Sequence, residues 1–157
     1  MSCDAVAFSA MLWLASTSPV GAQLPAPAVA SAPHSVASEP LFADIVRRAG
    51  GLKAEAEAWR KSSLDGDTAG LAGFPAFKAA LGDLADLDMK GHVTLAARGT
   101  DGDLKCILKG ISQDLPVKFH DLEVAATPKA RDQAIRELTY LLNDNVEVIT
   151  APPTPPA

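Results

Sequence analysis

The sequence predicts an all-α fold, an up-down four-helix bundle, from three observations. Apolar residues recur at steps of three and four along most of residues 40–150, which is the spacing of one face of a helix. Proline stands where helices would begin, at Pro75 and Pro128. The segments between the periodic stretches are mostly short, which favours antiparallel neighbours. We therefore assign residues 40–150 to one helical domain.

The first helix is expected at residues 41–61. Gly50 and Gly51 weaken its middle by roughly 1 kcal/mol per glycine relative to alanine, so we expect a bend there. The apolar residues that share its buried face are Phe42, Ile45, Ala49, Leu52, Ala56 and Trp59.

The second helix is expected at residues 75–98. It follows residues 62–73, whose glycine, aspartate and serine content is typical of a loop. Pro75 suits the first helical position because its missing N–H needs no partner there. The apolar residues that follow at helical spacing are Phe77, Leu81, Leu84 and Leu87.

The third helix is expected at residues 101–125, capped by Thr100. Pro116 removes one backbone donor, so this helix should be kinked or split near Leu115. Its apolar face continues at steps of three and four through Leu104, Ile107, Leu108, Ile111, Leu115, Phe119 and Leu122.

An alternative for the same region is a β-hairpin, which would make the fold α+β. Residues 92–95 and 104–108 could form two strands joined by a tight turn at Asp101 and Gly102, packed on the helices. Helical spacing sustained from Leu104 to Leu122 outweighs one turn dipeptide, so the helical bundle is preferred.

The fourth helix is expected at residues 128–143. Thr127 is a candidate N-cap, and Pro128 occupies the first helical position. Residues 143–145 (Asn-Asp-Asn) suggest its end, and residues 146–150 would extend the helix or dock as a strand. The apolar residues of its buried face are Ala134, Ile135, Leu138, Leu141 and Leu142.

Outside the helical domain the sequence predicts an export signal and flexible ends. Residues 5–15 form an uncharged apolar run that is too short to span a bilayer. Small residues up to Ala22 fit a signal-peptidase site, so we expect a signal peptide at 1–22. Residues 23–39 and 151–157 are rich in proline, which predicts a disordered tether and tail. The mature protein should be periplasmic or extracellular, with no stable membrane span.

Charge and motif content exclude several function classes. The chain has 14 Lys and Arg against 19 Asp and Glu, a net charge of −5, which disfavours binding to nucleic acid or anionic membranes. It lacks the phosphate-binding loop, the nucleophile elbow and the zinc-protease motif. We therefore expect a non-enzymatic module that binds an unidentified protein or small molecule, or has a structural role in the cell envelope. A homodimer is one form that this binding could take.

Three residues are candidates for contact with a cofactor: His92, Met89 and His120. Four-helix bundles include haem proteins, and histidine and methionine are axial groups in such proteins. The covalent haem signature C-x-x-C-H is absent after Cys106. The alternative function is therefore a non-covalent haem- or metal-binding bundle that uses His92 or His120. In that hypothesis Asp88 orients His92, with Met89 beside it.

Cys106 is the one cysteine left after cleavage at Ala22, so we expect no intrachain disulfide in the mature chain. We expect it to pack as a small buried hydrophobic residue. A reactive pair with His120 is disfavoured, since fourteen residues of continuous helix separate the two by about 20 Å. Apart from the haem- or metal-binding alternative, no metal site is expected, because no spacing of His, Cys or Asp supplies the three or four ligands that a metal needs, and residues 83–94 lack the glycine and glutamate of a calcium loop.

Overall fold

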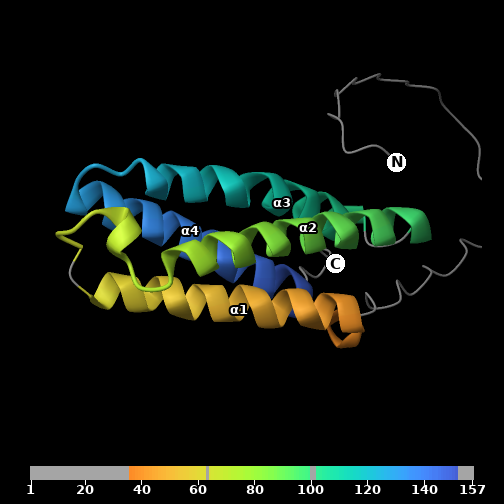
Figure 1. Cartoon of the computed structure of the whole chain (residues 1–157). Helices are drawn as coiled ribbons and strands as arrows, with labels where there is room; N and C mark the ends of the chain where they lie inside the picture. Colours follow the sequence, from red (N-terminus) through yellow and green to blue (C-terminus); the bar gives the residue numbers. More distant parts are fainter. Residues whose placement is uncertain (1–35, 63, 100–101, 152–157) are drawn as a thin grey trace, which may run out of the picture. The chain divides into compact units, whose positions relative to one another are not determined.

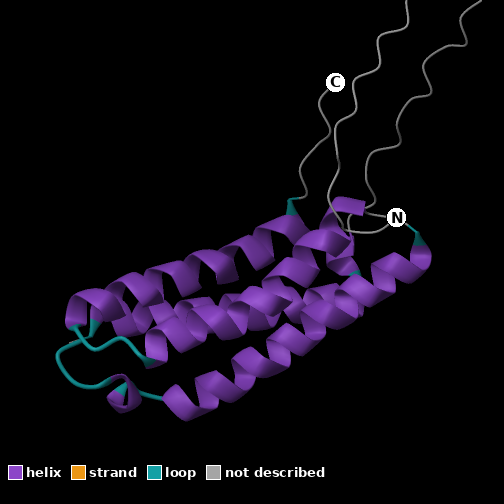
Figure 2. Ribbon diagram, turned by 90° about the horizontal axis from the view of Figure 1, so that it is seen from above, coloured by secondary structure: helices purple, strands orange, loops and turns teal. Residues whose placement is uncertain are grey.

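The computed structural model of the chain describes residues 36–62, 64–99 and 102–151. Within these residues it contains four long α-helices and no strand. The helices lie side by side in both views of the bundle (Figures 1 and 2). They are α1 (Pro40–Lys61), α2 (Phe74–Arg98), α3 (Gly102–Glu123) and α4 (Pro128–Thr150).

Each helix packs against two neighbours. Helix α1 lies against α2 and α4, and α3 lies against the same two helices, so α2 and α4 face each other across a diagonal of the bundle. The prediction of an all-α helical bundle is confirmed. The alternative β-hairpin is wrong, because residues 92–95 belong to α2 and residues 104–108 to α3.

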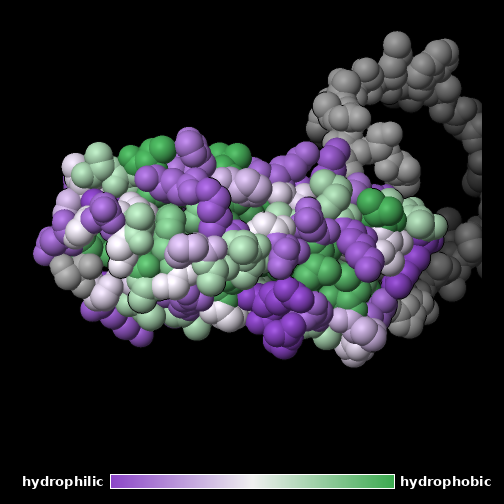
Figure 3. Space-filling view, in the orientation of Figure 1, coloured by the Kyte–Doolittle hydropathy of each residue, from purple (hydrophilic) through white to green (hydrophobic). Residues whose placement is uncertain are grey.

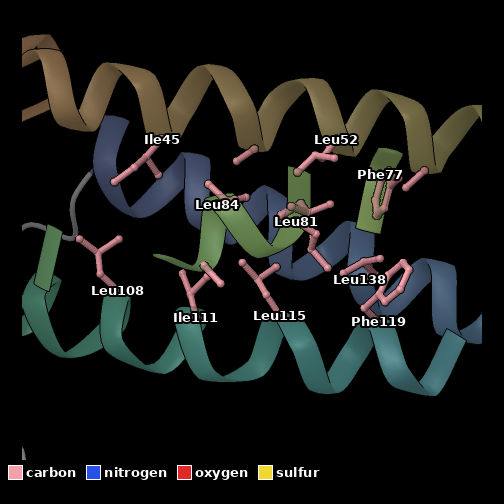
Figure 4. Close-up of a cluster of buried hydrophobic side chains, with 14 of the residues drawn as sticks. Ile45, Leu52, Phe77, Leu81, Leu84, Leu108, Ile111, Leu115, Phe119 and Leu138 are labelled. Carbon is pink, nitrogen blue, oxygen red and sulfur yellow. The ribbon is translucent and has the colours of Figure 1, made fainter. Parts of the chain in front are cut away.

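The core is a continuous column of apolar side chains that all four helices contribute. Figure 4 shows side chains of α1 and α3 pointing toward each other, with those of α2 and α4 between them. All six residues predicted on the buried face of α1 are buried. Leu87, Ile107 and Leu141 are half-buried at the edge of the core. On the visible outer face, hydrophilic and hydrophobic residues interleave (Figure 3).

One end of the bundle contains a cluster of four aromatic rings, which we call the aromatic end. Trp59 and Phe77 have ring centroids 4.4 Å apart, and Phe74 stacks on Phe119 at 5.1 Å. The indole N–H of Trp59 donates to the carbonyl of Ala72 at 2.8 Å. This bond fastens the loop that follows α1 to the core.

The same loop is held by two further hydrogen bonds. The Thr68 hydroxyl, in the 3-10 turn η2 (Thr68–Gly70), donates to the carbonyl of Leu122 at 3.2 Å. The guanidinium of Arg131, itself buried, donates to the carbonyl of Leu64. Residues that the sequence assigned to a loop therefore form a packed cover over the aromatic end.

The helix ends follow the expected chemistry. Thr127 caps α4, and its hydroxyl oxygen accepts from the amide of Ala130 at 3.1 Å. Pro128 is the first helical residue. Helix α2 ends at Arg98 and is capped by Gly99, whose φ of +68° lies in the left-handed region that favours glycine. The predicted cap at Thr100 lies outside the described residues.

Three sequence-based expectations differ from the structure. Helix α4 does not end at 143–145 but runs to Thr150, so residues 146–150 extend the helix, the first of the two alternatives, and Asn145 has a buried partner in the core. Helix α3 runs unbroken through Pro116. Val36, in the turn η1 (Val36–Ser38), is buried against the core, so the helical body includes residues that composition assigned to the tether.

No described helix is apolar over a stretch long enough to cross a membrane. The predicted signal peptide at 1–22, residues 23–35 of the predicted tether, and all but Ala151 of the predicted tail at 151–157 lie outside the described residues.

Candidate functional site

His92 is placed by the packing of α2 against the start of α3. Its Nδ1 lies 2.7 Å from the carbonyl oxygen of Lys105. A carbonyl oxygen only accepts, so this contact requires the proton on Nδ1. Asp88, which the sequence suggested as the group that orients His92, bonds instead to Asn145. The expected Asp88–His92 pair is therefore not formed.

Met89 and His120 lie apart from His92. Met89 is half-buried and lines a shallow depression between α2 and α3 that Ser112 and Pro116 share. The side chain of His120 is exposed and lies 3.9 Å from a carboxylate oxygen of Glu123. His92 contacts Lys105 at the start of α3. His120 lies fifteen positions after Lys105, which is about 22 Å further along the helix. The two histidines cannot bind one iron together.

The described residues contain no group of three or more His, Cys, Asp or Glu side chains arranged to hold a metal ion. We assign none of the three candidate residues as a metal ligand. Cys106 is half-buried on α3, where full burial was expected, and its sulfur is disulfide-bonded. The expectation that Cys106 is the one cysteine applies to the chain after cleavage at Ala22, and it stays a prediction.

The most unusual group in the core is a polar pair that the sequence-based candidates did not include as a pair. Asp88 of α2 and Asn145 of α4 are both fully buried, at 0 % exposure. The amide nitrogen Nδ2 of Asn145 donates to Oδ2 of Asp88 at 2.8 Å. The other polar atom of each side chain, Oδ1 of Asp88 and Oδ1 of Asn145, has no hydrogen-bond partner.

Burial controls the ionisation of this pair. Desolvation of the carboxyl group raises the pKa of Asp88 to about 8, and the hydrogen bond from Asn145 opposes that change. A carboxyl group in a hydrocarbon environment keeps its proton because the charged form loses its hydration. The buried position of Asp88 therefore favours the neutral, protonated form of its carboxyl group.

A depression on the outside of the described bundle lies around Tyr140, on the face of α4 that points away from the core. Tyr140 is 69 % exposed. It stands in a shallow depression of about 850 Å³ that reaches across α4 to α1 on one side and α3 on the other. We call this the Tyr140 surface. Its residues are Lys53, Arg60, Asp114, Lys118, Arg136, Glu137, Thr139, Tyr140, Leu141, Asn143 and Asp144.

Bonds between helices fix both borders of the Tyr140 surface. On the α1 side, Lys53 donates to Asn143 at 2.8 Å. On the α3 side, Lys118 pairs with Glu137 at 2.7 Å, and this contact lowers the pKa of Glu137 and raises that of Lys118. The borders are thus held in place, while the Tyr140 ring between them faces solvent.

Acidic residues at the C-terminal half of this surface are close to one another. The pKa of Asp144 is raised, first by its partial burial and second by the negative charge of Glu147. A cation that approached Asp144 from outside would be attracted, because it would offset both effects.

The sequence contained a signal for the buried pair. Asp88 continues the spacing of Leu81 and Leu84, and Asn145 continues that of Leu138 and Leu142, so both lie on the stripe that faces the core.

Comparisons of the chain with protein-family models, with curated proteins and with solved structures find no match.

Proposed function

We propose that the protein is an exported helical module of the cell envelope, without catalytic activity, that associates with a protein through the Tyr140 surface. The observation that carries the proposal is an aromatic ring, 69 % exposed, surrounded by charged side chains of both signs from three helices. Tyrosine and arginine are enriched at the centres of protein interfaces. Mixed charge fits a protein surface better than a polyanion.

The charges around Tyr140 fit a second copy of the same chain. Arg136 lies one helical turn before Tyr140, and Asp144 lies one turn after it. If two copies of α4 cross antiparallel at Tyr140, Arg136 of each copy faces Asp144 of the other, and two-fold symmetry forms this pair twice. The same operation places Gln133 opposite Glu147. The raised pKa of Asp144 supports this arrangement, since a guanidinium from the second copy would stabilise its carboxylate.

Photocrosslinking tests whether the surface is used. A photoreactive amino acid would replace Tyr140 in cells that export the protein, with Val93, an exposed residue of α2 at 59 % exposure, as the matched control position. We expect a product of twice the chain mass from position 140 and none from position 93. A crosslinked product that contains another protein would show that this protein, and not a second copy of the chain, is the partner. No product from position 140 would contradict the proposal.

Charge reversal tests the pairing itself. Arg136→Asp and Asp144→Arg should each weaken self-association about tenfold, because each removes two symmetric ion pairs. The double variant should restore it, as sedimentation velocity at low salt would show. Equal weakening in the double variant would contradict the antiparallel arrangement. Circular dichroism of each variant checks that the bundle is intact.

The export part of the proposal rests on the apolar run and the small residues before Gln23. Mass spectrometry of the protein recovered outside the cytoplasm should find an N-terminus at Gln23. A chain that retains Met1 and stays in the cytoplasm would contradict it.

A further inference from the structure

The Asp88–Asn145 pair leaves two oxygens unsatisfied in the core of the bundle. One hydrogen bond of 2.8 Å already joins the two side chains. The two atoms without a partner are Oδ1 of Asp88 and Oδ1 of Asn145. Both are acceptors, and neither side chain is exposed to water that could donate to them. An ionised carboxylate in this position would be a buried charge without a counter-ion, which is strongly unfavourable.

A single proton satisfies both atoms. On Oδ1 of Asp88 it would donate to Oδ1 of Asn145, while the amide N–H of Asn145 continues to donate to Oδ2 of Asp88. A carboxylic acid and a primary amide then form a ring closed by two hydrogen bonds. We propose that Asp88 and Asn145 form a buried proton-binding site, in which this acid–amide ring joins α2 to α4 across the diagonal of the bundle.

The surroundings of the site supply no alternative counter-charge. Ionisable residues of the packed helices in this region include Arg48 of α1, Lys105 and Lys109 of α3, and Asp144 of α4. Arg48 is engaged in an ion pair on its own helix. Burial and the Asn145 hydrogen bond account for the shifted pKa of Asp88, and none of these charged residues contributes to it.

The site makes the stability of the bundle depend on pH. The pKa of Asp88 is about 8 in the folded chain, against 3.8 as its ordinary value. Between these two pH values the folded chain holds a proton that the unfolded chain has released, so raising the pH favours unfolding. The unfolding constant should rise about tenfold per pH unit in this window. The stabilisation is complete below pH 3.8 and is lost by about pH 8.

The test uses the full chain and its Asp88→Asn variant. An amide at position 88 can donate to Oδ1 of Asn145 and accept from its Nδ2, so it closes the same ring without a titrating proton. The unfolding constants of both chains would be measured with urea from pH 4 to pH 8. The unfolding constant of the unaltered chain, divided by that of Asp88→Asn, should rise about tenfold per pH unit. Asp83→Asn, at an exposed carboxylate of α2, is the matched control and should keep the slope of the unaltered chain.

A second measurement needs no variant to fold. Carbon-13 NMR of the Asp88 side-chain carboxyl group in the unaltered chain should show it titrating near pH 8. Titration near the ordinary value of 3.8, or parallel pH profiles for the unaltered chain and Asp88→Asn, would overturn the proposal. Both outcomes are independent of self-association through the Tyr140 surface, because the proton site lies in the core.

Discussion

The core-facing positions of the helices hold aromatic rings at one end of the bundle and a polar pair toward the other. At the aromatic end, Trp59 and Phe77 place rings where the four helices meet, and the loop after α1 covers them. Toward the other end, the equivalent stripe of α2 carries Asp88, and that of α4 carries Asn145. Ring packing contributes stability directly. A buried polar pair recovers little more than the cost of its own desolvation. We infer that the aromatic cluster contributes more to stability than the polar pair does.

The largest loss of stability is expected when the largest ring of the aromatic end is removed. Trp59→Ala should reduce the free energy of unfolding by about 3–5 kcal/mol, because it leaves a cavity and frees the carbonyl of Ala72. Urea unfolding followed by circular dichroism measures the change. Tyr140→Ala removes an aromatic side chain that is 69 % exposed, and it should change stability by less than about 0.5 kcal/mol. Similar losses in the two variants would refute the role given to the aromatic end.

The second prediction concerns the polar pair. Asn145→Leu removes the donor to Asp88 and should cost about 1–3 kcal/mol, because a buried carboxyl group then lacks its partner. Replacing both Asp88 and Asn145 by leucine should restore the unaltered stability or exceed it, since no polar atom is left buried. Urea unfolding at one pH compares the three chains. A double variant as unstable as the single one would mean that the pair is worth more than its desolvation cost.

The third prediction concerns the helix starts, where the effects should be smaller than at Trp59 or at the polar pair. Thr127→Ala, at the aromatic end, should cost about 1 kcal/mol through loss of the cap. At the opposite end α1 begins after Glu39, which makes no side-chain cap but pairs with Arg98 at 2.7 Å. Glu39→Ala should have a smaller effect that salt diminishes, because exposed ion pairs are screened. Thermal unfolding at low and high salt distinguishes the two variants, because only the effect of Glu39→Ala should diminish with salt.

Most of the fold could be predicted because helical spacing is local information. The steps from Phe42 to Trp59 place six side chains on one face, and all six are buried. The cap at Thr127 was equally predictable, since its partner Ala130 lies three residues away. The hairpin alternative failed because one turn dipeptide could not compete with continuous helical faces on both sides of it.

The candidate sites were less predictable because their partners are far apart in the sequence. Asp88 and Asn145 are 57 positions apart, and residues 143–145 resemble a helix end when only their neighbours are considered. His92 was expected to pair with Asp88 one turn away, whereas the packing of α3 offers it the carbonyl of Lys105. The exposure of Tyr140 depends on where α4 sits between α1 and α3, which spacing alone does not give.

The diagonal bond between α2 and α4 also limits how the helices can slide. Moving α4 by one helical turn, about 5.4 Å, would bring Leu138 to the level of Leu142 and so keep hydrocarbon against hydrocarbon. The same shift would separate Asn145 from Asp88 and leave both polar groups in an apolar environment. Leucines accept several alignments, whereas the pair accepts one. Two residues that add little to stability therefore select a single register from among those that the apolar core would tolerate.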